Sequence, residues 1–213
     1  LMSTVLSKGC CTCTTSGELS NSELSLHNES NTVSVHNKAS RIRLLLFDVD
    51  GVLTDGRIEL HPDGSESKCF HIRDGAAIMW ANRAGLLTGI LSARTSVATT
   101  LRTKQLEMPI VLQGVTVKLS AYEQVLADYQ LTDTEVAYMG DDLLDLAVLA
   151  RVGLSAAPAD AAIGVRQKVD WISSARGGEG AVRDLIEVVL RARSLWPPII
   201  ESQADPESDL SHG

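Results

Sequence analysis

The amino-acid sequence predicts an α/β fold, a doubly wound Rossmann-like parallel sheet with helices on both faces. Short apolar runs alternate along the chain with amphipathic stretches of helical periodicity, which is the pattern of βαβ units. The 213 residues are 44% hydrophobic, which is enough for one sizeable core. Polar residues directly follow several apolar runs, where an open parallel sheet binds its ligands. We therefore expect one domain with a site at the carboxyl edge of its sheet.

Five apolar runs are expected to form the strands of this sheet. They are Leu44–Phe47, Leu87–Leu91, Ile110–Leu112, Val136–Met139 and Gly153–Ala156. The stretches between and after them carry apolar residues at helical spacing and predict helices. These stretches are Ala76–Ala84, Ser96–Leu106, Val117–Tyr129, Leu143–Ala150 and Ala181–Arg193.

The segment between the first strand and the first helix has a different pattern. Two extended runs, Arg57–Leu60 and Ser67–Ile72, flank a turn at residues 61–64. In that turn Pro62 presets one dihedral angle and Gly64 permits a positive φ. The pattern predicts a β-hairpin that projects from the sheet.

Composition divides the chain into three parts. Residues 1–40 contain 14 Ser and Thr and no aromatic residue, so they are predicted to be a disordered Ser/Thr-rich extension. Residues 41–196 hold the α/β pattern. Residues 197–213 begin with two prolines and carry four acidic residues without Lys or Arg, which predicts a flexible acidic tail.

Charge and cysteine content restrict the class of partner and the compartment. The net charge of −8 argues against nucleic acid and membrane surfaces and favours a small-molecule partner. No apolar stretch is long enough for a membrane span, so we expect a cytoplasmic protein. Cys10, Cys11 and Cys13 crowd into one polar segment away from Cys69, which argues against a disulfide framework.

Chemically active side chains follow the expected strands. They are Asp48 and Asp50 after the first run, Ser92 after the second, Lys118 at a helix start, and Asp141, Asp142 and Asp145 after the fourth. Because parallel strands end at one edge, we expect carboxylates, a hydroxyl and an ammonium to meet there. The set suits phosphoryl transfer, and the carboxylates call for a divalent cation with hard oxygen ligands, which favours Mg²⁺.

Each of these residues can be given a role. Asp48 would attack phosphorus and form an aspartyl-phosphate. Asp50 would protonate the leaving oxygen and then activate water. Ser92 and Lys118 would hold the phosphoryl oxygens. The candidate metal ligands are Asp48, Asp50, Asp141, Asp142 and Asp145, although Asp145 could equally orient its helix.

Four motifs resemble those of the haloacid dehalogenase (HAD) phosphatase superfamily. They are D-V-D-G-V-L-T-D-G at residues 48–56, L-S-A-R at 91–94, Lys118, and G-D-D-L-L-D at 140–145. The closer resemblance is to the 3-deoxy-D-manno-octulosonate 8-phosphate (KDO-8-phosphate) phosphatases. It rests on F-H-I-R-D-G at 70–75, Q-G at 113–114 and G-G-E-G-A-V-R-D at 177–184. The chain departs from that pattern with Ser92-Ala93 where Thr-Gly is usual, and with Glu179 where a basic residue is frequent.

Spacing and the resemblance together describe the active site. Only 44 residues separate Asp48 from Ser92 and 26 separate Ser92 from Lys118, which leaves no room for a cap domain. The resemblance implies a homotetramer in which a neighbour's glycine-rich C-terminal segment, including Gly177 and Gly178, closes the site. It also implies substrate contacts for a set of residues beyond the phosphate site. That set is Asp50, Arg73, Gly75, Arg94, Gly177 and Gly178.

The function expected from these observations is Mg²⁺-dependent hydrolysis of an acidic-sugar phosphate, first of all KDO-8-phosphate. Glu179 leaves open the alternative that the substrate is a nine-carbon ulosonate 9-phosphate, that of KDN or N-acetylneuraminate. A non-catalytic subunit with the same fold is the alternative from another functional class.

Overall fold

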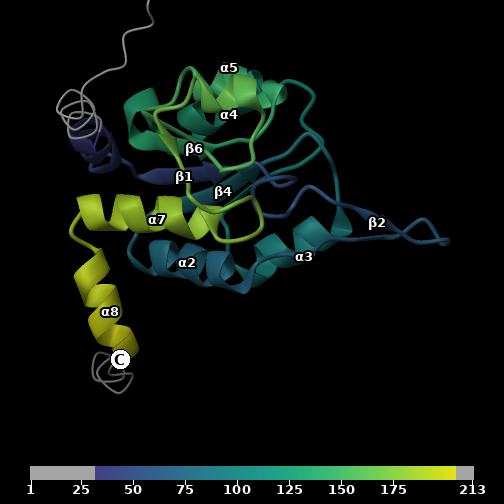
Figure 1. The fold of residues 1–213 in the computed structure, drawn as a ribbon, viewed down its shortest axis with the longest axis horizontal. Helices are drawn as coiled ribbons and strands as arrows, with labels where there is room; N and C mark the ends of the chain where they lie inside the picture. Colours follow the sequence, from purple (N-terminus) through teal and green to yellow (C-terminus); the bar gives the residue numbers. More distant parts are fainter. Residues whose placement is uncertain (1–31, 205–213) are drawn as a thin grey trace, which may run out of the picture.

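The computed structural model describes residues 32–204, at whose centre lies a six-stranded parallel sheet (Figure 1). The strands are β1 (Leu44–Phe47), β4 (Leu87–Leu91), β5 (Ile110–Leu112), β6 (Val136–Met139), β7 (Leu154–Ala157) and β8 (Trp171–Ile172). Their spatial order is β5-β4-β1-β6-β7-β8, so the chain moves outward from β1 and then returns to its other side. This reversal places the carboxyl ends of β1 and β6 at a topological switch point.

Helices cover both faces of the sheet. On one face α2 (Ile72–Arg83) packs against α7 (Ala181–Ala192), and on the other lie α4 (Lys118–Tyr129) and α5 (Leu146–Leu149) (Figure 1). The remaining helices are α3 (Val97–Gln105), α6 (Ile163–Arg166), α8 (Trp196–Ala204) and the 3₁₀ turns Asp133–Glu135 and Leu143–Asp145. In the described part of the chain, none of the helices has both the length and the apolar character that a membrane span requires.

Strand β1 shows why its sequence is a continuous apolar run. Leu44 and Leu46 point into the core beneath α4, whereas Leu45 and Phe47 point into the core beneath α2 and α7. All four side chains are fully buried. Alternate residues of a strand face opposite sides, so a central strand covered on both sides has no polar face. The strand that carries the candidate nucleophile at its end is therefore fixed from both sides.

The fold class predicted from the sequence is confirmed. A short antiparallel hairpin of β2 (Glu59–Leu60) and β3 (Glu66–Ser67) projects from the sheet (Figure 1). Between β1 and α4 the described chain forms only this hairpin, α2, β4, α3 and β5, and so contains no cap domain.

Several predicted element boundaries are wrong in detail. The hairpin strands are shorter than expected, and α2 begins at Ile72, inside the segment predicted to be extended. The side chain of Ile72 is 77% exposed, so the first turn of α2 lacks the apolar periodicity that marks a buried helical face. Strand β8 was not predicted because two residues are too few to show a pattern.

Both domain boundaries also move outward. Residues 32–39, assigned above to the extension, are helical, and Val35 and Ala39 are buried in the core. At the other end α8 continues to Ala204, because Pro197 and Pro198 lie in its first turn, where a missing N–H breaks no helical bond. The rest of the predicted extension and tail lies outside the described residues, as do Cys10, Cys11 and Cys13.

A buried carboxylate links α2 to α7. Asp74 is 1% exposed, and its Oδ1 accepts a hydrogen bond of 2.9 Å from the main-chain N–H of Arg183, in the first turn of α7. Burial raises the pKa of Asp74. This carboxylate satisfies one of the N–H groups that have no partner within the helix.

Replacing Asp74 with alanine is expected to lower the free energy of unfolding by about 1–2 kcal/mol, the usual effect of losing a helix cap. Guanidinium unfolding, with midpoints compared at an unchanged m-value, measures the loss. Asp128→Ala is the matched control, because Asp128 is exposed and, within residues 32–204, is bonded only to Gln124 on its own helix. We expect it to change stability by less than about 0.5 kcal/mol. Equal losses in the two variants would contradict the capping role.

Candidate active site

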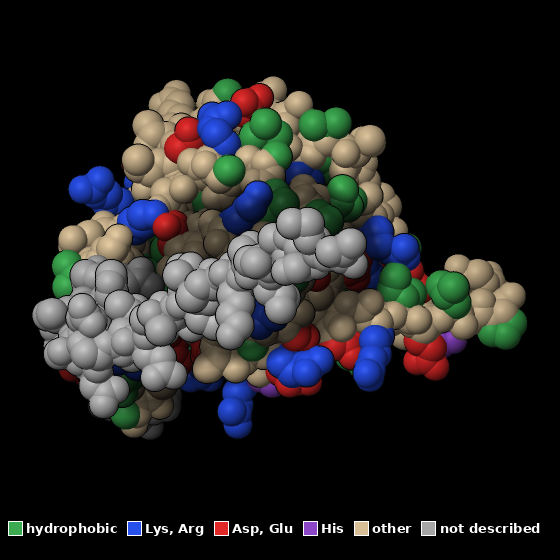
Figure 2. All heavy atoms as spheres, turned by 45° about the horizontal axis from the view of Figure 1, so that its top comes forward, with side chains coloured by type: hydrophobic (Ala, Val, Ile, Leu, Met, Phe, Trp, Pro, Cys, Tyr) green, Lys and Arg blue, Asp and Glu red, His purple; other side chains and the backbone are tan. Residues whose placement is uncertain are grey.

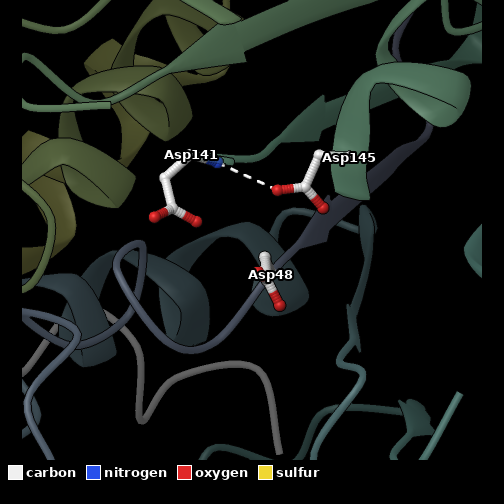
Figure 3. A group of neighbouring side chains, drawn as sticks. All are labelled: Asp48, Asp141 and Asp145. Carbon is white, nitrogen blue, oxygen red and sulfur yellow. Dashed lines mark hydrogen bonds between the residues drawn. The ribbon is translucent and has the colours of Figure 1, made fainter. Parts of the chain in front are cut away.

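The ends of two paired strands bring the first carboxylates together. Phe47 of β1 pairs with Met139 of β6, and the main-chain N–H of Asp48 donates to the carbonyl of Met139 at 3.0 Å. Asp48 therefore lies beside the loop that carries Asp141 and Asp145, and Figure 3 shows the three side chains together. One carboxylate oxygen from each lies within 4.8 Å of the other two. The carboxylates that were expected to converge at the edge of the sheet therefore lie close together.

Lys118 lies between two of these carboxylates. Its Nζ is 3.0 Å from Asp48 Oδ1 and 2.6 Å from Asp145 Oδ1, and its side chain is 4% exposed. Burial lowers the pKa of this lysine, but the two carboxylates outweigh burial and raise it above its ordinary value. The side chain comes from the first residue of α4, near the positive end of that helix. A cation held there can neutralise the oxygens of a phosphate group.

Both carboxylate oxygens of Asp145 accept hydrogen bonds from other groups of the protein. Its Oδ1 accepts from Lys118 and from the hydroxyl of Tyr138 at 2.6 Å, and its Oδ2 accepts from the main-chain N–H groups of Asp141 and Asp142. This bonding favours the orienting role that the sequence left open for Asp145. Tyr138 was missed in the sequence, although a tyrosine in a buried strand signals a hydroxyl that needs a partner.

Asp141 has an oxygen without a hydrogen-bond partner. Its Oδ1 is buried, and burial together with Asp48 and Asp145 raises the pKa of Asp141 to about 7. Burial likewise raises the pKa of Asp48 to about 6, against the opposing charge of Lys118. Gly51 permits this approach, because it has φ of +91° and a Cβ there would lie 2.2 Å from Asp141 Oδ2. Lys118 alone cannot neutralise this cluster, which fits the Mg²⁺ predicted from the sequence.

A cavity of about 230 Å³ opens onto this cluster. It is lined by Asp48, Asp50, Ser92, Ala93, Arg94, Lys118, Asp141, Asp142, Leu144 and Asp145. Every residue predicted to attack, protonate or hold the phosphate is in this set. Asp142 lies at the exposed rim of this cavity. Its side chain accepts a hydrogen bond from the main-chain N–H of Leu143 and caps the 3₁₀ turn that follows.

Other predicted substrate-binding residues do not line this cavity. Arg73 is exposed on α2. Gly75 faces Arg102, where a Cβ would lie 2.2 Å from the guanidinium Nη2. The structure thus gives Gly75 a packing role within the chain.

The glycine-rich segment packs on the loop that follows β1. A Cβ on Gly177 would lie 1.8 Å from the carbonyl oxygen of Gly51, and the N–H of Gly178 donates to the carbonyl of Val52 at 2.9 Å. These contacts lie within one chain and explain why glycine is needed here. Closure of a neighbouring subunit's site by this segment stays a prediction.

Comparison with known proteins agrees with this geometry. A family profile described as haloacid dehalogenase-like hydrolase matches residues 81–185. The 3-deoxy-D-manno-octulosonate 8-phosphate phosphatase of Yersinia pestis is 39% identical over 156 residues, which cover 73% of this chain and 83% of the relative. The chain belongs to the KDO-8-phosphate phosphatase family of HAD-like hydrolases. It is a phosphoric monoester hydrolase of that family.

Solved structures of relatives extend the match for this HAD-like phosphatase. A probable phosphatase of the YrbI family from Pseudomonas syringae has a TM-score of 0.80 and 40% identity, and the match covers 81% of this chain and 98% of that one. The KDO-8-phosphate phosphatase of Moraxella catarrhalis, solved with magnesium ion, phosphate ion and KDO, has a TM-score of 0.77 and 31% identity. That match covers 79% of this chain and 97% of the relative.

The raised carboxyl pKa values predict how pH and Mg²⁺ affect stability. A group whose pKa is higher in the folded than in the unfolded state weakens the fold as pH rises between the two values. For Asp48 and Asp141 this window runs from the ordinary value of 3.8 to about 6 and about 7. We therefore expect Mg²⁺ to raise the Tm more at pH 8 than at pH 5.5, where protons compete for the carboxylates.

Thermal unfolding in chelator and in Mg²⁺ at the two pH values tests this expectation. Asp141→Asn keeps the shape of the side chain and should lose most of the Mg²⁺-dependent shift. Asp128→Ala, on an exposed helix surface, should keep it. An equal shift in all three proteins would show that Mg²⁺ does not act through this cluster.

Proposed function

We propose that the protein hydrolyses KDO-8-phosphate to KDO and inorganic phosphate, with Mg²⁺ as cofactor. The observation that carries this proposal is the cavity in which Asp48, Lys118 and the Asp141 loop meet, in a chain 39% identical to a KDO-8-phosphate phosphatase. Arg94 lines the same cavity, with a half-exposed guanidinium that suits the carboxylate of an acidic sugar.

The chain's own side chains account for both halves of the reaction. One Asp48 oxygen forms a bond to phosphorus while the bond between phosphorus and the sugar oxygen breaks, which gives an aspartyl-phosphate. Asp50 gives its proton to the departing sugar oxygen. Water then attacks phosphorus, its proton passes to Asp50, and the bond to Asp48 breaks to release phosphate.

Lys118 and Ser92 hold the phosphoryl oxygens during both steps. Ser92 is 3% exposed at the end of β4, and its hydroxyl oxygen accepts from the main-chain N–H of Arg94. Asp48 and Asp141 would hold Mg²⁺, which would supply the positive charge that lets a phosphate approach the carboxylates. The active site is open to water, because no cap domain covers it in the described part of the chain.

Phosphate release with Mg²⁺ tests the substrate. The three substrates are KDO-8-phosphate, a nine-carbon ulosonate 9-phosphate and glucose 6-phosphate, compared by kcat/KM. We expect at least a hundredfold preference for KDO-8-phosphate. A preference for the nine-carbon substrate would favour the alternative that Glu179 keeps open, and no turnover of any of the three would favour the non-catalytic subunit.

We also propose that the protein assembles as a homotetramer through the hairpin. Figure 2 shows this arm projecting beyond the body of the molecule with apolar side chains on its surface. Leu60 on β2 is 74% exposed, and contact with another subunit would remove this apolar surface from water. Light scattering coupled to size exclusion should give four times the chain mass, and Leu60→Asp should reduce the assembly. A monomeric wild type would contradict this proposal.

A further inference from the structure

The base of the hairpin places a lysine against the candidate acid and base. Lys68 follows β3, and its Nζ lies 2.6 Å from Asp50 Oδ1. Its side chain is 1% exposed, whereas that of Asp50 is 19% exposed. Lys68 is not among the residues that line the cavity, so its ammonium contacts Asp50 from outside the cavity. Nothing in the sequence pattern pointed to this contact.

The other oxygen of Asp50 is in a different environment. Asp50 Oδ2 is buried without a hydrogen-bond partner, and the Nε of Arg94 lies 3.6 Å from it. Arg94 is held in turn by Glu66 of the hairpin, with Nη2 3.0 Å from Oε2. The two Asp50 oxygens thus differ, one fixed by a lysine and the other without a bonded partner.

The chemistry of the lysine decides what each oxygen can do. An ammonium group only donates hydrogen bonds, so it holds Oδ1 as an acceptor. When Asp50 carries a proton, that proton must therefore be on Oδ2. Burying an ammonium is unfavourable unless it is paired. Among the described residues, Asp50 Oδ1 is the one carboxylate oxygen within hydrogen-bond distance of Lys68, because Glu66 Oε1 is 3.9 Å away.

We propose that Lys68 is the positioning residue for proton transfer by Asp50. By fixing Oδ1 it turns Oδ2 toward the reacting group. As the bond between phosphorus and the sugar oxygen breaks, the electron pair stays on the sugar oxygen, which takes the proton from Oδ2. In the second half, water bonds to phosphorus and its proton returns to Oδ2 while the electron pair of the breaking bond returns to Asp48. This inference rests on the proposed phosphatase function.

The test uses two substrates that differ in their need for an acid. The alkoxide of a sugar phosphate needs a proton to leave, whereas the phenolate of p-nitrophenyl phosphate leaves without one. Because kcat/KM reports only the steps through departure of the first product, it isolates this proton transfer. In Lys68→Met we expect kcat/KM to fall about a hundredfold for the sugar phosphate that the wild type hydrolyses fastest. We expect about a threefold change at most for p-nitrophenyl phosphate, since its leaving group needs no acid.

Two variants serve as controls. Lys68→Arg keeps a charged donor and should recover much of the lost activity, which a purely steric role of the side chain would not produce. Lys104→Met makes the same substitution at an exposed position on α3 and should leave both kcat/KM values unchanged. If Lys68→Met does not fold, Lys68→Ala, which also removes the donor, takes its place.

The outcomes separate this inference from the function on which it rests. A wild type that hydrolyses neither substrate refutes the phosphatase proposal and the inference with it. An active wild type whose Lys68 variants lose both activities equally, or neither, refutes the inference alone. A selective loss on the sugar phosphate, with recovery in Lys68→Arg, supports it.

Discussion

Replacing Asp48 with asparagine is expected to reduce kcat on the preferred sugar phosphate by at least about 10⁴-fold. The amide is nearly the same size as the carboxylate but is a poor nucleophile, so the first bond to phosphorus cannot form. The fold should survive, because Lys118 keeps Asp145 as a partner at 2.6 Å. The substitution also removes a buried carboxylate whose pKa burial raises to about 6.

The combination of lost turnover and retained stability is the diagnostic result. Phosphate release and thermal unfolding in chelator at pH 8 measure the two quantities on one preparation. We expect the Tm of Asp48→Asn to equal or exceed that of the wild type. The substitution removes the repulsion between the Asp48 carboxylate and the negative charges of Asp141 and Asp145. Turnover within tenfold of the wild type would rule out the covalent intermediate on Asp48.

Replacing Lys118 with methionine is expected to damage both activity and stability. Asp48 and Asp145 would lose the cation between them, and such a break in a buried ion pair typically costs about 3–5 kcal/mol. Loss of a group that holds the phosphoryl oxygens should lower kcat by about 10²–10³-fold. Guanidinium unfolding and phosphate release measure these effects.

A second substitution separates the two effects of Lys118. Asp145→Asn in the Lys118→Met background removes one of the two uncompensated charges, so it should recover part of the stability and none of the activity. Lys104→Met, at an exposed position, is the control and should change stability by less than about 0.5 kcal/mol. A loss below about 1 kcal/mol in Lys118→Met would contradict the importance of this charge for the fold.

The sequence predicted those parts of the site that follow a buried strand. Asp48 and Asp141 each come after a run whose side chains face two cores, and such runs are recognisable because they contain no polar face. Asp48 and Asp141 lie close together because parallel strands have their carboxyl ends at the same edge of the sheet. Lys118 was predictable as a cation at the start of a helix, where it needs a nearby anion.

The hairpin contacts could not be predicted in the same way. Lys68 and Glu66 reach the site because of the direction in which the hairpin leaves the sheet, and no periodicity of the local sequence encodes that direction. Their pattern is that of ordinary exposed hairpin residues. The helix at residues 32–39 was missed for a related reason, since two buried residues, Val35 and Ala39, are enough to dock it.

The bonding of Asp145 also determines how the site behaves before any ligand arrives. One oxygen of this carboxylate holds the N–H groups of Asp141 and Asp142, and the other holds Lys118. The backbone that presents Asp141 is therefore already ordered, so little conformational entropy is lost when a cation and a phosphate bind. The amide hydrogens of Asp141 and Asp142 should accordingly exchange slowly with solvent even in chelator, in a loop whose next two side chains, Leu143 and Leu144, are exposed.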